Sequence, residues 1–508
     1  MHSSPYQRRT YFYPAPAILA GLLTAQIIAT LQVYVSNRSI YLTLKAIGEA
    51  GYLTVLNQQT IAQLQKLSTA LCGGLFFTLS VGAGISLLSF AAAWLWDRIC
   101  VRRPIFLILM LLLWTALVAA VNIRGFLPFV TLYFVIIPPV VFPGTLQWMP
   151  KNVRKKTHQN GILHIILLIL LGLLWAPQMK DGLFINIRDQ LLLTNPIGEN
   201  IVRFYYRRTL YPAKVMKPLH QKLMKTFSLE ALPEGHIKNA LLEGLLARDW
   251  IPIENRGKVD LKVSLRGKEL FLEDGKGTVL KVSATDFPTR LTTVLKEYSN
   301  LTDRHHFFRR FTFYSLLIGF PVILYISFYS LISFFVGRWV PRRIASLLCA
   351  IVCLITGVML LMLLRQNHEW KGRQNDPGRA LISDERQERL GALKHIYKDH
   401  QNISRFSAYK AVLTSPDTAE RYWLAKALGS SRNDETYPDL LALLKDPSPV
   451  VVCAAISSLG HRGEKKAVPN ILKQLRESQH PYVQWYAYKA LKALGWKQKA
   501  RKMRFFSH

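Results

Sequence analysis

The sequence predicts a polytopic α-helical membrane protein that carries a small α+β extramembrane domain and a C-terminal α-solenoid domain. Long apolar runs in two parts of the 508-residue chain predict the membrane-spanning helices. Two-residue alternation in the middle of the chain predicts strands, and a motif that returns roughly every 31–32 residues near the C-terminus predicts a helical repeat.

The apolar runs are roughly 17–27 residues long and nearly free of charge, which suits a crossing of about 30 Å at 1.5 Å per residue. A helix of a soluble core rarely stays apolar on all sides over such a length. The runs lie near 14–35, 70–96, 104–121, 126–148, 161–177, 311–336 and 344–364. We therefore expect a multi-pass protein whose first partner is the phospholipid bilayer.

Polar stretches between and after these runs define the expected domains. They are a membrane bundle of about five spans at 1–178, an extramembrane α+β domain at 179–308, a two-span hairpin at 309–365, and a repeat domain with a basic tail at 366–508. Arg8 and Arg9 precede the first run, which is too long for an ordinary signal peptide, so we expect an uncleaved signal anchor.

Lysine and arginine in the short connections predict the orientation. If the N-terminus is cytoplasmic, three basic connections fall on the cytoplasmic side: Arg98, Arg102 and Arg103; Lys151, Arg154, Lys155 and Lys156; and Arg338, Arg342 and Arg343. Both soluble regions then lie on the periplasmic side of a bacterial inner membrane. Their location on one side follows independently, because the connection 337–343 is too short to hold a domain and an even number of crossings separates them.

Two features of the apolar runs allow alternative interpretations. Pro138, Pro139 and Pro143 interrupt the fourth run, which is either a kinked span or a re-entrant hairpin that would reverse the orientation downstream. His164 in the fifth run either reaches the interface or marks a functional site within the membrane. The scarcity of other ionisable residues in the spans argues against an ion-coupled transporter.

The segment after the fifth run mixes basic and aromatic residues, and the whole chain has a formal net charge of +34. Bases close to a span, interleaved with tyrosines, suit contact with anionic headgroups. The candidate headgroup-binding residues are Arg203, Arg207, Arg208, Lys214 and Lys217. The same residues suit a protein partner or a solvated helix face, and nucleic acid is not the expected partner.

Downstream, leucine and isoleucine at helical spacing predict a helix within 228–246. Four segments of two-residue alternation separated by turn residues then predict a β-meander, at 250–254, 258–266, 269–273 and 278–283. A final helix at about 288–298 would complete the α+β domain.

The C-terminal motif appears as 421–429, 452–460 and 484–491, each with small residues before a Leu, and with Pro-containing helical segments at 437–446 and 468–476 between them. Small residues let paired helices approach closely, while leucine fills the shared core. These residues resemble HEAT-like repeats of the phycobilisome-lyase type, over about 420–496 and reaching back toward 386. Val452 departs from the pattern, since such repeats usually carry Arg there.

The resemblance implies an α-solenoid that presents an extended face to a protein partner. Aromatic residues on the repeat helices are the candidates for partner binding: Tyr422, Trp423, Trp485, Tyr486 and Tyr488. A contribution of some of them to the solenoid core is the competing interpretation.

The sequence contains no Walker loop, CxxC, HExxH or GxSxG motif, so we expect no cofactor, no metal and no catalytic residues. Cys349 and Cys353 share a helix face but lack His or carboxylate neighbours, and we interpret them as small packing residues. The predicted function is that of a membrane-anchored, non-enzymatic scaffold or assembly factor that recruits a protein partner. A transport or lipid-handling component is the alternative, and an unrecognised enzyme is the second alternative.

Overall fold

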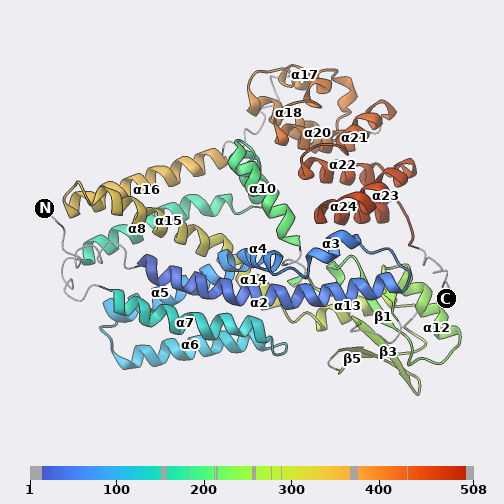
Figure 1. Ribbon diagram of the computed structural model, residues 1–508, viewed down its shortest axis with the longest axis horizontal. Helices are drawn as coiled ribbons and strands as arrows, with labels where there is room; N and C mark the ends of the chain where they lie inside the picture. Colours follow the sequence, from blue (N-terminus) through green and yellow to red (C-terminus); the bar gives the residue numbers. More distant parts are fainter. Residues whose placement is uncertain are drawn as a thin grey trace. The chain divides into compact units, whose positions relative to one another are not determined.

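The computed structural model describes residues 14–149, 157–180, 182–210, 212, 216–253, 259–275, 277–287, 289–365, 376–431 and 433–498. The chain forms two compact units. The first, called the membrane unit here, comprises Met1–Val35, Leu67–Leu183 and Asp303–Arg365. The second, called the sheet–solenoid unit, comprises Ser36–Lys66, Phe184–Thr302 and Gln366–His508. Figure 1 follows the chain through both.

Six helices are long and apolar enough to cross a membrane, which confirms the predicted run of long apolar helices. They are α2 (Pro14–Glu49), the continuous α4–η1–α5 (Leu67–Arg98), α6 (Pro104–Asn122), α7 (Pro128–Trp148), the continuous α14–η5–α15 (His306–Val336), and Ile344–Leu364 within α16 (Arg342–Arg365). The fifth predicted run forms α8 (Thr157–Trp175). It yields a seventh span if α8 and the following Leu183–Leu192 are taken as one bent span.

Helix α7 runs without a break through Pro138, Pro139 and Pro143, so the structure favours a span over the re-entrant hairpin. A proline has no N–H to donate to the carbonyl four residues earlier, which in a membrane must find another donor. For Pro138 that carbonyl belongs to Phe134, and the indole Nε1 of Trp114 on α6 donates to it at 2.8 Å. A neighbouring helix thus satisfies the group that the proline leaves free.

Small residues let the helices of the membrane unit approach closely. The π-helical turns η1 (Thr78–Gly82) and η5 (Ser315–Gly319) contact each other. A Cβ added at Gly84 would lie 2.1 Å from the hydroxyl oxygen of Ser315, and one at Gly319 would lie 3.1 Å from the Cα of Gly84. Lipid supplies no hydrophobic force between helices, so such close van der Waals packing has to hold them together.

The middle domain is a mixed five-stranded sheet with helices. Its strands are β1 (Lys225–Ser228), β2 (Trp250–Pro252), β3 (Leu261–Arg266), β4 (Glu269–Asp274) and β5 (Gly277–Ser283), in the order β2-β1-β3-β4-β5. Strands β3, β4 and β5 pair antiparallel, whereas β1 pairs parallel with both β2 and β3. The predicted meander is therefore correct for β3–β5 and wrong for β2, because β1 lies between β2 and β3.

Two helices pack on the buried residues of this sheet: α12 (His236–Leu246) and α13 (Leu291–Leu301). Helix α12 begins later than the predicted 228, because Ser228 is the last residue of β1 and a loop follows it. It connects the parallel strands β1 and β2, a connection that requires a crossover rather than a hairpin. The hydroxyl of Tyr298 on α13 donates to the backbone carbonyls of Asp260 and Glu273, each at 2.9 Å.

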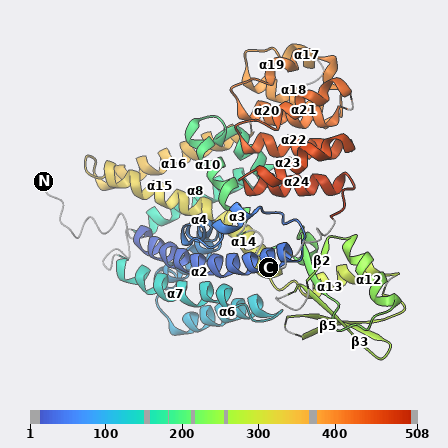
Figure 2. The same ribbon diagram turned by 45° about the vertical axis from the view of Figure 1, so that its right-hand side comes forward.

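The C-terminal helices form the predicted solenoid. The long helices α18 (Arg386–Lys398), α20 (Thr418–Ser430), α22 (Pro449–Arg462) and α24 (Pro481–Ala493) pack in succession. The shorter α19 (Tyr409–Val412), α21 (Tyr437–Leu443) and α23 (Val468–Glu477) alternate with them, after α17 (Pro377–Ala380). The stack is visible in Figure 2. Pro438, Pro449, Pro469 and Pro481 stand in first turns, where a missing N–H costs nothing.

Contacts between successive repeats recur at the repeat period. Arg386 donates to Asp417, the capping residue of α20, and Arg389 donates to Glu420 at 2.8 Å, both pairs being separated by 31 positions. A Cβ added at Gly429 would lie 2.5 Å from the Ser458 side chain, and one at Gly460 would lie 2.9 Å from the Ala490 Cβ. Polar pairs therefore join α18 to α20, and a glycine lets α20 approach α22 and α22 approach α24.

The segment 36–66 belongs to the sheet–solenoid unit and packs on the last repeat. Asn57 caps α3 (Gln58–Gln63), and its side-chain amide donates to the carbonyls of Arg476 and Ser478 at 3.1 and 2.9 Å. The buried side-chain carbonyl of Gln484 accepts from the Asn57 backbone N–H at 3.1 Å.

Candidate functional site

One face of the solenoid holds residues 188–209 of the same chain, called the docking segment here. The segment consists of a π-helical turn, η3 (Arg188–Leu192), and helix α10 (Pro196–Arg208). The side chain of Asn195 caps α10 by accepting from the Gly198 N–H at 2.8 Å. Helix α10 contacts α22 and α24, and η3 contacts α18 and α20. π-helical turns are rare and frequently lie at functional sites, so η3 marks this contact as a candidate functional site.

Asp189 is the centre of the contact and is fully buried. Its Oδ1 accepts from the Arg188 guanidinium at 2.7 Å, and its Oδ2 accepts from the Trp423 indole Nε1 at 2.7 Å. Lys394 of α18 lies 3.6 Å from the same Oδ2, and Arg386 donates to the backbone carbonyl of Asp189 at 3.0 Å. Burial lowers the pKa of Lys394, and the neighbouring Asp189 only partly offsets this effect. The buried carboxylate thus binds donors from two solenoid helices.

Arg188 extends the contact onto an aromatic ring. Its guanidinium lies 3.8 Å from the centroid of the Tyr422 ring, a geometry in which the ring face attracts the cation. Burial opposes the charge of Arg188, yet the neighbouring Asp189, followed by Tyr422 and Tyr206, outweighs it, so the pKa of the guanidinium lies above its ordinary value. Arg188 therefore stays charged within the contact.

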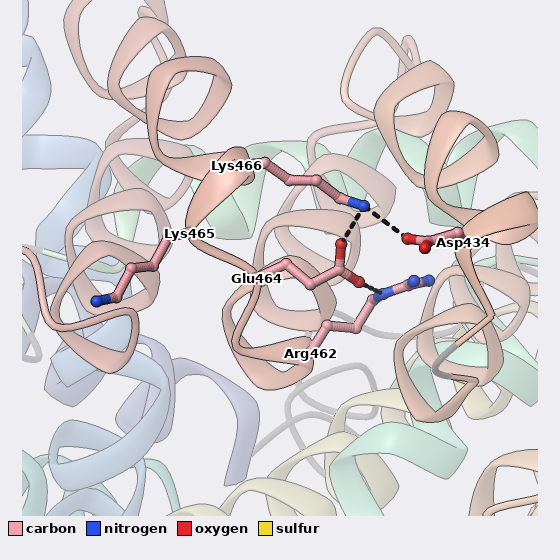
Figure 3. Close-up of a pocket in the computed structure, with 5 residues that line it drawn as sticks. All are labelled: Asp434, Arg462, Glu464, Lys465 and Lys466. Carbon is pink, nitrogen blue, oxygen red and sulfur yellow. Dashed lines mark hydrogen bonds and ion pairs between the residues drawn. The ribbon is translucent and has the colours of Figure 1, made fainter.

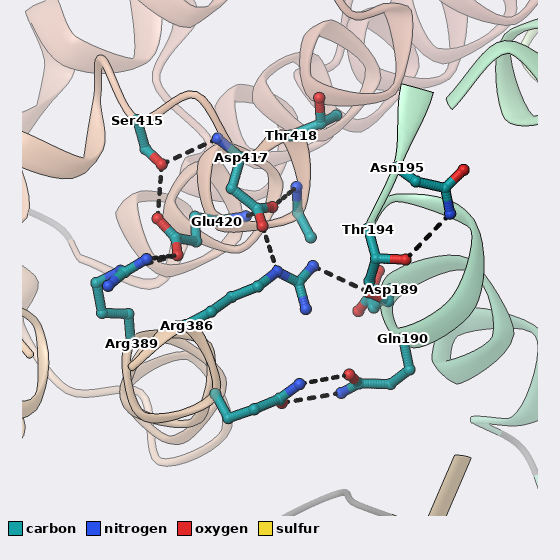
Figure 4. A network of polar contacts seen from close by, with 12 residues as sticks. Asp189, Gln190, Thr194, Asn195, Arg386, Arg389, Ser415, Asp417, Thr418 and Glu420 are labelled. Atoms are coloured by element: carbon teal, nitrogen blue, oxygen red, sulfur yellow. Dashed lines mark hydrogen bonds and ion pairs between the residues drawn. The ribbon is translucent and has the colours of Figure 1, made fainter. Parts of the chain in front are cut away.

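Further polar pairs align the segment along the solenoid, as Figure 4 shows for its first half. The side-chain amides of Gln190 and Gln387 donate to each other's oxygens at 3.3 and 2.9 Å. Thr418 donates to Glu199 at 2.9 Å. At the other end, the rings of Tyr206 and Tyr482 lie 5.1 Å apart, and burial raises the pKa of both hydroxyls.

Apolar side chains fill the space between these polar pairs. Leu193 and Val202 of the docking segment are buried with Leu390, Ala419 and Val450 of the solenoid in one cluster. The contact therefore combines an apolar cluster with polar pairs, as in a protein–protein interface.

The structure places the five predicted partner-binding aromatics in two different environments. Tyr422 and Trp423 are half-buried beneath the docking segment, and Trp485 and Tyr486 are half-buried on α24 with their rings 5.0 Å apart. Tyr488 lies in the core, and its hydroxyl donates to Asp249 at 3.3 Å. Two of the five aromatics thus contact this chain's own docking segment.

The five predicted headgroup-binding bases also differ from one another. Arg203 and Arg207 are exposed on α10, and Arg208 is half-buried. Lys217 lies over the Trp485 ring, 5.0 Å from its centroid, and burial together with Lys489 lowers its pKa. Lys214 lies outside the described residues.

Sequence reasoning missed the residues at the centre of the contact, namely Arg188, Asp189, Gln190, Arg386, Gln387 and Lys394. One signal was present: Arg188 and Asp189 form a charged pair between 183–187, which is apolar except for Asn186, and the three leucines at 191–193. A charged pair in such surroundings is typical of a buried, partnered group.

An open pocket of about 380 Å³ lies on another part of the solenoid, lined by Asp434, Arg462, Glu464, Lys465 and Lys466. Figure 3 shows that Asp434, Arg462, Glu464 and Lys466 pair with one another, whereas Lys465 points away from them. Lys466 bridges Asp434 and Glu464 at 2.6 and 2.8 Å, and Arg462 binds Glu464 at 2.5 Å. This network joins successive repeats.

A polar cluster lies within the membrane unit. The His164 Nδ1 is 2.9 Å from the Tyr325 hydroxyl, the His164 ring packs edge-on to Tyr329 at 4.4 Å, and the Tyr329 hydroxyl is 3.1 Å from Ser346. Within the described residues, no group of three or more His, Cys, Asp or Glu could hold a metal ion.

Comparison with known proteins identifies one region of the chain. The family model for HEAT repeats matches residues 407–495, which confirms the predicted resemblance over α19–α24. No curated protein and no solved structure shows a significant match to the chain. The C-terminal region is thus a HEAT-repeat solenoid, a fold whose members bind proteins in general, joined to candidate membrane spans.

Proposed function

We propose that this protein is a non-enzymatic membrane-anchored scaffold or assembly factor that recruits a protein partner through its HEAT-like solenoid and its α+β domain. The observation that carries the proposal is the docking segment. The solenoid face binds Asp189 through Trp423 and Arg188 through Tyr422, so it already has aromatic and polar groups that hold a helical peptide. Trp485 and Tyr486, further along the same solenoid, supply a second half-buried aromatic pair for a partner.

The two soluble regions are proposed to face one compartment, on the periplasmic side of a bacterial inner membrane. The inclusion of Phe184–Thr302 and Gln366–His508 in one compact unit supports the single compartment. The basic short connections support the periplasmic side.

A pull-down of the full chain in mild detergent, followed by mass spectrometry, tests the scaffold. The double variant Trp485→Ala/Tyr486→Ala removes the second aromatic pair, and Trp339→Ala, on an 86% exposed residue elsewhere, is the matched control. We expect a reproducible protein partner that the double variant loses and the control retains, with the double variant still folded but less stable, because both rings also pack on the solenoid core. No reproducible partner, or equal recovery with all three proteins, would contradict the proposal.

The polar cluster in the membrane unit favours a second candidate, a transport or lipid-handling component. His164, Tyr325 and Tyr329 bring polar groups together between candidate spans, where such groups are costly unless they are used or paired. Lipid that co-purifies with the wild-type chain and is lost in His164→Leu would support this candidate over the scaffold.

A further inference from the structure

Helix α10 has a second face, turned away from the solenoid, that exposes large apolar side chains. Ile197, Ile201, Phe204 and Tyr205 are 75, 50, 44 and 49% exposed. Their spacing of four, three and one positions gathers them on one side of a helix with 3.6 residues per turn. This apolar stripe is contiguous, unlike the scattered apolar residues of an ordinary surface.

Two arginines lie beside the stripe. Arg203 and Arg207 are both exposed and stand four positions apart, so they form a basic row along the same helix. Interfacial helices combine these features: apolar and aromatic side chains enter the acyl boundary, while neighbouring bases bind headgroup phosphates.

The apolar stripe cannot face the solenoid, because the opposite face of α10 already binds the solenoid. Val202 is buried in the solenoid contact, Glu199 accepts from Thr418, and Tyr206 packs on Tyr482. Rotation of α10 to cover the stripe would break all three contacts. A surface outside this unit must therefore cover it.

We propose that the apolar stripe of α10 lies in the headgroup layer of the bilayer, with Arg203 and Arg207 on the phosphates of anionic lipids. The bilayer is the occupant because the chain has six candidate spans, and α10 follows closely on the apolar helix α8. The net charge of +34 and the arginine row complement an anionic surface. Since the other face of α10 binds the solenoid, the helix fastens the repeats to the membrane surface. This inference goes beyond the scaffold proposal, because it assigns a lipid ligand whether or not a protein partner exists.

Lipid contact can be measured on the full chain in nanodiscs. A fluorophore on Phe204→Cys, in a background without the five native cysteines, reports the stripe, and one on Lys262→Cys, exposed on β3, is the control. We expect lipids brominated near the headgroup to quench the first fluorophore severalfold more than the second. If only aqueous iodide quenches the fluorophore at position 204, the stripe faces water and the proposal is overturned. If neither quencher reaches this fluorophore, a protein or a second copy covers the stripe, which also overturns the proposal. If the cysteine-free chain fails to fold, a photo-crosslinker at position 204 of the otherwise native chain replaces the fluorophore. Lipid adducts then support the proposal, and protein adducts overturn it.

The arginine row is tested by competition between brominated anionic and brominated zwitterionic lipids at low ionic strength. Each arginine should contribute up to about a fivefold preference for the anionic lipid, weakened by salt. Arg203→Gln/Arg207→Gln should lose this preference, whereas Lys262→Gln/Lys268→Gln, which removes two exposed charges from the sheet, should keep it. An unchanged preference in the arginine variant, or an equal loss in the lysine variant, overturns the assignment of anionic lipid.

Discussion

Asp189 carries its charge in a place closed to solvent, with Arg188 and Lys394 as the cations beside it. A buried ion pair contributes little net stability, because the loss of hydration offsets the attraction. Removal of one partner is different, since it leaves the remaining charges buried and uncompensated. The buried pair therefore specifies where the docking segment binds rather than how stable the fold is.

Asp189→Ala is expected to weaken the docking of residues 188–209 by about 3–5 kcal/mol, because the buried Arg188 and the half-buried Lys394 would lose their anion. Hydrogen exchange of the full chain measures this as faster exchange across α10. Glu297→Ala, an exposed carboxylate on α13, is the control and should leave the exchange of α10 unchanged. Unchanged exchange in Asp189→Ala would show that the apolar centre alone holds the segment.

His480, which caps the start of α24, predicts a pH dependence. Burial and then the nearby Arg207 lower its pKa to about 4, and neither ring nitrogen has a hydrogen-bond partner among the described residues. The unfolded chain, with an ordinary His pKa of about 6.5, binds the proton more readily than the folded one. Stability is therefore complete above about pH 6.5 and falls by up to about 3 kcal/mol as the pH drops toward 4. Denaturant unfolding of His480→Gln between pH 4 and 7 should lack this component, and an identical slope in both proteins would refute the assignment.

For single residues, the sequence indicates which side chains lie on a given helix face better than it indicates which residues they contact. Tyr422 and Trp423 were predicted as candidates for partner binding, yet their contact with Arg188 and Asp189 of the same chain could not be inferred. Periodicity gives the face of a helix, but it does not tell which distant segment covers that face.

Glycine at equivalent positions of two repeats explains why α20, α22 and α24 pack so closely. Gly429 and Gly460 occupy equivalent places in α20 and α22, each facing the next long helix. The absence of a side chain there lets the backbones approach, at a propensity cost of about 1 kcal/mol per glycine in a helix.

Gly460→Val is expected to destabilise the solenoid, because its Cβ would lie 3.0 Å from the Cα of Ala490, a backbone atom that cannot move alone. Overpacking of this kind costs about 1–3 kcal/mol, and a β-branched residue recovers little of the glycine propensity cost. Urea unfolding should show the loss, while His461→Val, on the exposed neighbouring residue, should stay near wild type. A stability equal to that of the control would mean that α24 shifts without strain.

Elements with a strong local period were predictable, and those defined by distant pairing were not. The long apolar helices and the repeats carry their pattern in every turn. Strand β1 has four residues, follows a basic aromatic segment, and is a strand only because β2 and β3 lie on both sides of it. The predicted meander was wrong at β2 because β1, which separates β2 from β3, was not predicted as a strand.

At the scale of the whole molecule, both soluble regions are expected in one compartment. Phosphatase fusions at Gly275, in the turn after β4, and at the C-terminus should both be active, and cytoplasmic fluorescent fusions at the same sites should both be dark. Activity at only one site would contradict the compact unit formed by residues 184–302 and 366–508. Fluorescence at both sites would instead reverse the orientation.

The composition of the sheet–solenoid unit from three separate stretches was beyond prediction. The predicted domains follow the division of the chain into apolar and polar stretches, so residues 36–66 fell within the predicted membrane bundle at 1–178. In the structure they belong to the sheet–solenoid unit. Their place on the last repeat depends on Asn57 and Gln484, which are 427 positions apart and carry no local signal of their pairing.

The docking segment also sets an order of events during synthesis. Asp189 meets Arg386 and Trp423, which lie 197 and 234 positions later in the chain. At about 5–20 residues per second, a ribosome needs tens of seconds to produce the missing repeats. During that interval the solenoid-binding side of α10 (Glu199, Val202 and Tyr206) and the pair Arg188–Asp189 have no solenoid to bind. The nascent chain therefore passes through a stage in which a chaperone or the membrane surface must shield both sides of α10, and the last repeats end that stage by taking one side.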